Sequence, residues 1–219
     1  IFLAACIRQE GEKKCKAEED FKWDKIELKY AKLFSITYKE DHALLKINQA
    51  GLEDYHYVLY PGSTAPKTQL KNQVSIHIPV KHVTCQATSH LGYFDALDRG
   101  YLCDGFLGTH LLRDPKHSEL AKQGSIKDFG EANWRDSEAL IQHNPDLLLL
   151  FPFENKTESH FRSKNNPILF IEEYAEKHPL ARAEWIKLHG LLSNRVAEAN
   201  ELFDQIEKRY LALLAKCDE

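Results

Sequence analysis

Side chains that could bind a small molecule gather in four short segments of the sequence. They occur at Thr88-Ser89-His90, from Glu131 to Trp134, at Phe153-Glu154 and at Glu172-Glu173-Tyr174. Hydroxyls, carboxylates and a phenol can hydrogen-bond a polar ligand, an imidazole can ligate a metal, and aromatic rings can stack on a flat ligand. The candidate ligand-binding residues are Thr88, Ser89, His90, Trp134, Phe153, Glu172, Glu173 and Tyr174.

Each candidate also has a purely structural interpretation. Thr88 or Ser89 could cap a following helix, and His90 could be a polar surface residue at a helix start. Glu172 and Glu173 could belong to a solvated loop, and the aromatic rings could be packing residues. The residues alone leave these alternatives open.

Motifs for catalysis and for nucleic-acid binding are missing from the sequence. There is no G-x-S-x-G, P-loop, H-E-x-x-H or G-x-G-x-x-G, and the 11 histidines are scattered. The formal net charge of −4 and the lack of a basic stripe argue against a nucleic-acid partner. No apolar run is long enough to span a bilayer. These observations favour a binding protein over an enzyme.

The pattern of apolar residues predicts an α/β fold in two parts. Residues 25–79 contain strand-like runs separated by turn residues, which predict a small antiparallel β module. Over residues 80–193, strands alternate with helices, and the run "PDLLLLF" is apolar throughout, as in a doubly covered parallel strand. This alternation predicts a Rossmann-like lobe, whose ligands would bind beyond the carboxyl ends of the strands.

A long helix is predicted over residues 194–216. Its apolar residues recur at helical spacing from Val196 and Ala199 through Phe203 to Leu213 and Leu214. At about 1.5 Å per residue it would be roughly 36 Å long, which is unusual for a globular protein. We expect the first half to pack on the lobe. We expect the second half, around Tyr210, Leu213 and Leu214, to project with its apolar face exposed.

The beginning of the sequence resembles a lipoprotein signal. Leu3-Ala4-Ala5-Cys6 is similar to the bacterial lipobox, in which the chain is cut before a cysteine that is then lipidated. A charged tether follows, so residues 1–24 are interpreted as a signal-peptide remnant, lipobox and tether, although a frayed core strand is the alternative. With no methionine in 219 residues, we expect the open reading frame to be longer. Cys85 and Cys103 lie in apolar runs and are predicted to be buried thiols.

Three connected segments resemble a known family. They are "IPVKHVTCQATSHLGYFDALD", "GSIKDFGEANWRDSEALIQHNPDLLLL" and "PILFIEEYAEKHPLARAEWIKLHGLL". Together they are similar to the iron–siderophore and cobalamin class of ABC-transporter substrate-binding proteins, over roughly residues 77–210. In that family two α/β lobes are joined by a rigid bridging helix and hold the ligand between them.

The resemblance has several implications. Residues 194–219 would be the truncated bridging helix, and the second lobe would be missing from this chain. The ligand would be a ferric chelate, heme or cobalamin, with no cofactor and no catalysis. Glu138 would dock on the ABC permease dimer. Lipidated Cys6 would anchor the protein at the periplasmic face of the inner membrane or at the cell surface. The alternatives are a receptor for bare Zn²⁺ or Mn²⁺, or a metal-dependent hydrolase with the β module as a lid.

Overall fold

The computed structural model describes residues 23–48, 53–67, 73–130, 137–152 and 166–217. Cys6, Trp134, Phe153 and Glu154, all named above, lie outside these ranges. No helix in the described part of the chain is long and apolar enough to cross a membrane.

The β module forms a four-stranded sheet in the order β1-β2-β3-β4. Its strands are β1 (Phe34–Tyr38), β2 (Ala43–Ile47), β3 (Tyr55–Tyr60) and β4 (Val74–His77). The first three strands pair antiparallel, but β4 pairs parallel to β3, with Val58 opposite Ser75. The module is therefore mixed rather than wholly antiparallel. Strand periodicity reveals which faces are buried but not the direction in which a strand runs.

The α/β lobe contains a five-stranded parallel sheet in the order β7-β6-β5-β8-β9. Its strands are β5 (Val83–Cys85), β6 (Cys103–Phe106), β7 (Lys127–Asp128), β8 (Leu147–Leu150) and β9 (Ile168–Phe170). All four strand pairs run parallel, and β8 is buried along its whole length. The predicted parallel sheet is confirmed. Only β7, a two-residue exposed edge strand, gave no sequence signal.

Four helices accompany the strands of the sheet or follow them. They are α1 (Thr88–Ala96), α2 (Pro115–Lys122), α3 (Ser137–His143) and α5 (Pro179–Glu184), with short 3₁₀ turns at Gly100–Leu102, Thr109–Leu111 and Glu173–Ala175. The Asp114 side chain caps α2 by accepting a hydrogen bond from the His117 N–H. Gly124 follows this helix at a φ of 77°.

Helix α1 ends at Ala96 without a glycine in the left-handed position beyond it, because Asp98 adopts that conformation at a φ of 55°. Aspartate tolerates this region better than most residues because its short side chain can bond locally. Gly100 instead makes a close approach: a Cβ there would lie 1.8 Å from Asp95 Oδ1.

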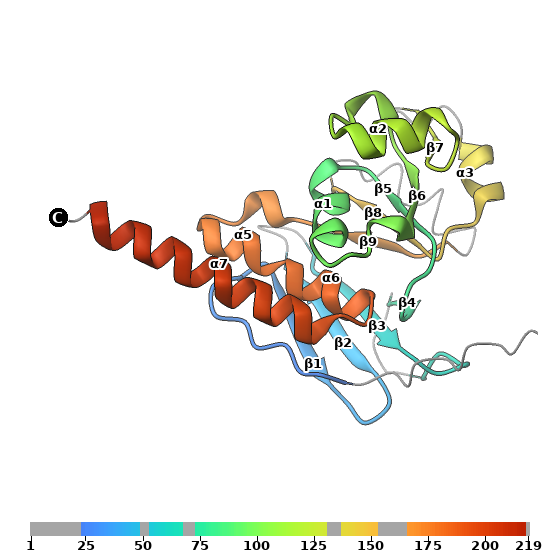
Figure 1. Ribbon diagram of the computed structural model, residues 1–219. Helices are drawn as coiled ribbons and strands as arrows, with labels where there is room; N and C mark the ends of the chain where they lie inside the picture. The colour runs from blue at the N-terminus through green and yellow to red at the C-terminus, as the bar shows by residue number, and fades with distance from the viewer. Residues whose placement is uncertain (1–22, 49–52, 68–72, 131–136, 153–165, 218–219) are drawn as a thin grey trace, which may run out of the picture.

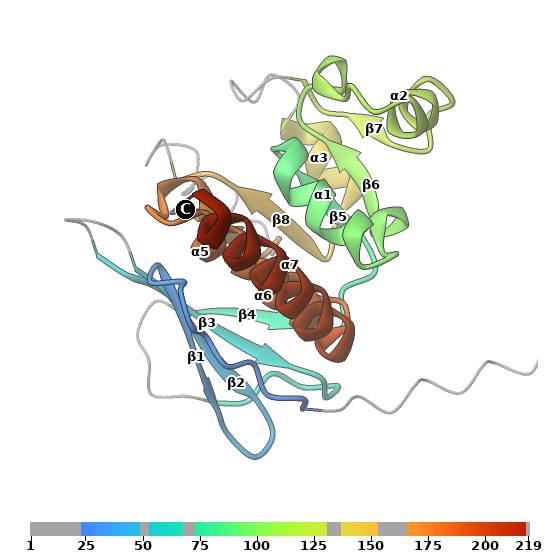
Figure 2. The same cartoon turned by 60° about the vertical axis from the view of Figure 1, so that its left-hand side comes forward.

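Helices α6 (Ile186–Leu192) and α7 (Val196–Cys217) complete the chain. Figure 2 shows α6 and α7 between the β1–β4 sheet and the α/β lobe. One cluster of buried residues extends through all three layers, from Phe34 in β1 through Trp185 and Leu188 to Val83 in β5. The two sheets therefore share a hydrophobic core.

The long helix α7 follows its sequence-based prediction except at Tyr210, which is half-buried and lies 5.6 Å from the His178 ring. Val196, Ala199 and Phe203 are buried against the rest of the chain. Leu213 and Leu214 are 63% and 48% exposed, and Figure 1 shows the red end of α7 projecting past the other elements. The stripe of apolar residues thus has a packing partner over only part of its length.

Candidate functional site

The carboxyl ends of β5, β8 and β9 bring together most of the described candidate residues. Ser89 lies in the first turn of α1, after β5, and Glu173 and Tyr174 begin the 3₁₀ turn after β9. The Ser89 hydroxyl donates a hydrogen bond of 2.6 Å to Glu173 Oε1. This bond joins two loops whose strands are separated by β8 in the sheet.

A row of rings fills the space between these loops. The His90 ring lies 4.9 Å from that of Phe151, and the Phe151 ring lies 5.1 Å from that of Tyr174. The second pair meets edge to face at 89°, a favoured geometry for aromatic rings. Phe151 directly follows β8, and its N–H donates to Gln86 Oε1 at 2.7 Å. Loops after β5, β8 and β9 therefore converge at one edge of the sheet.

Phe151 and Gln86 were not among the sequence candidates. The aromatic candidate near this strand was Phe153, which is two residues further along and lies outside the described residues. The rule that ligands bind beyond the ends of parallel strands selects Phe151 as well, because it is the first residue after β8. The error was to place the strand end too late.

The two capping interpretations are wrong for this helix. Ala87 is the N-cap residue of α1, and no side chain caps the helix. Thr88 and Ser89 are both exposed within the first turn, and the Ser89 hydroxyl is directed to Glu173 instead. Neither Thr88 nor Ser89 therefore caps α1.

His90 is neither a metal-facing nor a surface residue. Its side chain is fully buried, and neither ring nitrogen makes a hydrogen bond of good geometry. Burial, with a smaller effect of the nearby His189, lowers the pKa of His90 to about 3, although the Leu149 backbone partly offsets this. His90 is therefore a neutral core residue whose ring packs edge to face against that of Phe151.

Glu172 and Glu173 are buried rather than solvated. They are 7% and 5% exposed, whereas Tyr174 is 37% exposed. Glu173 Oε2 has no hydrogen-bond partner, and burial raises the pKa of this carboxyl despite the bond from Ser89. The buried Glu173 carboxyl thus has one oxygen bonded to the Ser89 hydroxyl and one oxygen without a hydrogen-bond partner.

Two further features lie away from this edge. Glu138 is exposed in the first turn of α3. A groove of about 530 Å³ runs between α2 and α3 beside β7 and is lined in part by Lys127, Phe129 and His143. It contains none of the candidate ligand-binding residues. Among the described residues, no group of three or more His, Cys, Asp or Glu side chains is arranged to hold a metal ion.

The sequence has a distant curated relative. It is 23% identical over 214 residues to an uncharacterized lipoprotein of Methanocaldococcus jannaschii, a match that covers 86% of this chain and 51% of the relative. The chain thus spans about half the length of this protein. No protein-family model matches the sequence.

Solved structures of similar fold include binding proteins of transport systems. An iron-uptake ABC transporter substrate-binding protein of Streptococcus pneumoniae, PiuA, matches 77% of this chain and 51% of its own, with a TM-score of 0.51 and 14% identity. A periplasmic binding protein of Veillonella parvula matches 75% of this chain and 49% of its own, with a TM-score of 0.51 and 17% identity. The siderophore-binding protein BauB, solved with a complex of acinetobactin and ferric iron, also scores 0.51, over 62% of this chain at 15% identity. These likenesses show a fold shared with about half the length of each of these three chains.

Proposed function

We propose that this chain belongs to the extracytoplasmic substrate-binding component of an ABC importer. Its ligand would be an iron complex, such as a ferric siderophore or heme, or cobalamin. The observation that carries the proposal is the convergence of the loops after β5, β8 and β9 on Ser89, Phe151 and Tyr174, in a fold like that of PiuA. PiuA is an iron-uptake protein, and BauB binds a ferric siderophore complex.

The chemistry of this edge suits a metal-organic ligand better than a bare metal ion. Exposed hydroxyls at Thr88 and Ser89 and the partly exposed Tyr174 ring offer hydrogen bonds and an aromatic surface. A bare Zn²⁺ or Mn²⁺ would need several converging nitrogen or oxygen ligands. His90, the only candidate histidine, is fully buried.

Titration of the full-length protein tests the proposal. The probes are a ferric catecholate, a ferric hydroxamate, heme, cobalamin and, separately, Zn²⁺ and Mn²⁺, each followed by tryptophan fluorescence. We expect saturable binding of one metal-organic probe and none of the bare ions. Binding of Zn²⁺ or Mn²⁺ alone, or of no probe in the panel, would contradict the proposal.

A matched pair of tyrosine variants locates the site. Tyr174→Ala should weaken binding of the selected probe about tenfold, because an aromatic contact contributes roughly 1–1.5 kcal/mol. Tyr101→Ala is the control, since Tyr101 is 68% exposed and precedes β6, at the amino end of that strand. Equal losses in both variants would argue against a site at the carboxyl edge.

Membrane anchoring through Cys6 is a second part of the proposal. The Leu3-Ala4-Ala5-Cys6 sequence supports it, and the relative in M. jannaschii is named a lipoprotein. In the native organism, Cys6→Ser should move the protein from the membrane to the soluble extracytoplasmic fraction. A variant that stays with membranes after a high-salt wash would disprove lipidation at Cys6.

Glu138 is proposed to contact the permease. Its exposure in the first turn of α3 supports this role. Glu138→Lys should reduce uptake in cells without changing ligand affinity in solution. An unchanged uptake rate would remove Glu138 from the interface.

A further inference from the structure

Residues 26–33, which we call the strap, are fastened by two glutamates far away in the sequence. Glu184 accepts hydrogen bonds of 2.8–2.9 Å from the backbone N–H groups of Lys29, Tyr30 and Ala31. Glu176 Oε1 accepts bonds of 2.9 Å from those of Lys32 and Leu33. Five consecutive backbone donors of the strap are thereby satisfied by two side chains.

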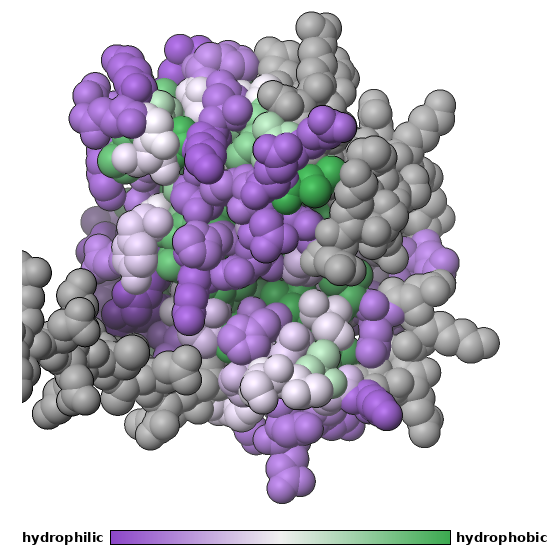
Figure 3. All heavy atoms as spheres, turned by 90° about the vertical axis from the view of Figure 1, so that its right-hand side faces the viewer, coloured by the Kyte–Doolittle hydropathy of each residue, from purple (hydrophilic) through white to green (hydrophobic). Residues whose placement is uncertain are grey.

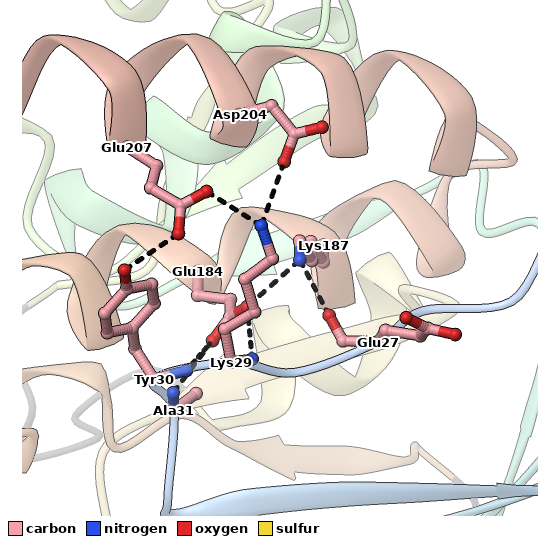
Figure 4. A network of polar contacts seen from close by, with 8 residues as sticks. All are labelled: Glu27, Lys29, Tyr30, Ala31, Glu184, Lys187, Asp204 and Glu207. Carbon is pink, nitrogen blue, oxygen red and sulfur yellow. Dashed lines mark hydrogen bonds and ion pairs between the residues drawn. The ribbon is translucent and has the colours of Figure 1, made fainter.

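The charge of Glu184 is balanced inside the protein. Glu184 is fully buried, and Lys187, which is 3% exposed, donates to its Oε1 at 3.0 Å. Lys187 also donates to the Glu27 carbonyl oxygen at 2.7 Å and lies 4.3 Å from the centre of the Phe203 ring. Figure 4 shows Glu184 of α5 and Lys187 of α6 pointing toward each other and toward the backbone of the strap. Removing one member would leave a buried charge unpaired, so the strap is held firmly.

The strap in turn contacts the middle of α7. Lys29 Nζ and the Tyr30 hydroxyl donate to the two oxygens of Glu207, each at 2.8 Å. The Tyr30 ring also stacks on His178 at 5.3 Å, and the His178 ring lies 5.6 Å from that of Tyr210. Beyond Tyr210, residues 211–217 are all exposed.

We infer that the strap fixes α7 to the α/β lobe as far as Tyr210 and sets the point beyond which the helix can move. Residues 196–210 then move with the lobe as one body, and bending of α7 is confined to the turns after Tyr210. The β module adds a further contact, because the Ile26 N–H donates a hydrogen bond of 3.0 Å to the Tyr38 hydroxyl of β1. This inference rests on the contacts alone and holds whatever ligand the protein binds.

Amide hydrogen exchange on two matched variants tests the inference. Glu207→Ala removes both hydrogen bonds from the strap and leaves the 3.8 Å ion pair of Lys29 with Asp204. Glu201→Ala changes an exposed residue on the same helix that accepts a hydrogen bond from Gln205. In Glu207→Ala, exchange of residues 203–210 should speed up about fivefold to tenfold, while residues 211–217 should change less than twofold. Glu201→Ala should leave both segments within twofold of the parent protein. Equal effects of the two variants, or no effect of Glu207→Ala, would overturn the inference.

A distance measurement locates the hinge independently. In a chain carrying Cys6→Ser, Cys15→Ser and Cys217→Ser, spin labels at Lys122→Cys and Arg209→Cys should give a narrow distance distribution. Labels at Lys122→Cys and Lys216→Cys should give a broad one, and Tyr30→Phe should broaden the first pair. A first pair as broad as the second in the parent background would contradict a fixed α7.

Discussion

At the residue scale, buried polar groups dominate the candidate site. Sequence reasoning identified Ser89, His90, Glu173 and Tyr174 because they follow apolar runs, and the structure brings them to one edge. It did not reveal that His90 points into the core, because a histidine after two hydroxyl residues carries no periodic signal of burial. It also could not reveal Glu184 and Glu176, whose partners lie 143–155 positions away along the chain.

His90 makes the protein sensitive to acid. Its pKa is lowered from 6.5 to about 3 in the folded state, so the unfolded chain binds a proton first as the pH falls. The contribution of His90 to the free energy of unfolding is therefore fully present above pH 6.5. It decreases between pH 6.5 and pH 3 by about 1.4 kcal/mol per pH unit. His189, whose pKa is lowered to about 4 by burial, acts in the same direction.

His90→Leu should remove the His90 part of this dependence. Because neither ring nitrogen makes a hydrogen bond of good geometry, we expect the free energy of unfolding at pH 8 to change by less than about 1.5 kcal/mol. Between pH 6 and pH 4, the free energy of unfolding should fall less steeply in the variant than in the parent, by about 1.4 kcal/mol per pH unit. Urea unfolding followed by tryptophan fluorescence measures both slopes. Parallel pH profiles would show that His90 is not buried in its neutral form.

At the element scale, the order and type of the elements were predictable, while their ends were not. Apolar runs located the strands, because a parallel strand covered on both faces is apolar throughout. Residues 179–192, for example, form two short helices, α5 and α6, that meet at Trp185. Nothing in the sequence marks this division, since Trp185 is buried and no glycine or proline interrupts the pattern there.

Two helical glycines should respond in opposite ways to the same substitution. A Cβ on Gly190 in α6 would lie 2.6 Å from Ala199 Cβ and 2.8 Å from the Arg195 carbonyl oxygen, whereas one on Gly92 in α1 has no neighbour within 4 Å. Gly190→Ala should destabilise by about 1–3 kcal/mol because α6 and α7 must separate. Gly92→Ala should stabilise by up to about 1 kcal/mol through helix propensity. Urea unfolding compares them, and a tolerated Gly190→Ala would mean that α6 and α7 pack less closely than described.

At the scale of the whole molecule, the two sheets and the helices between them form one framework with an unpartnered end. The shared core runs from Phe34 through Trp185 to Val83, and the strap adds polar contacts across the same layers. The resemblance of the sequence to bridging-helix binding proteins predicted the projecting end of α7, which composition alone would not have done. The exposed stripe at Leu211, Leu213 and Leu214 is the kind of surface that marks a missing contact.

Replacing two leucines of this stripe with lysine tests whether the stripe stabilises the fold or causes self-association. In the 219-residue chain, the double variant Leu213→Lys, Leu214→Lys should change the free energy of unfolding by less than about 0.5 kcal/mol, because both side chains are exposed. It should also reduce self-association in sedimentation experiments. Phe203→Ala, in the buried part of the same stripe, should lower the free energy of unfolding by about 3–5 kcal/mol. A large loss of stability in the double variant would show that these leucines pack against the chain in solution.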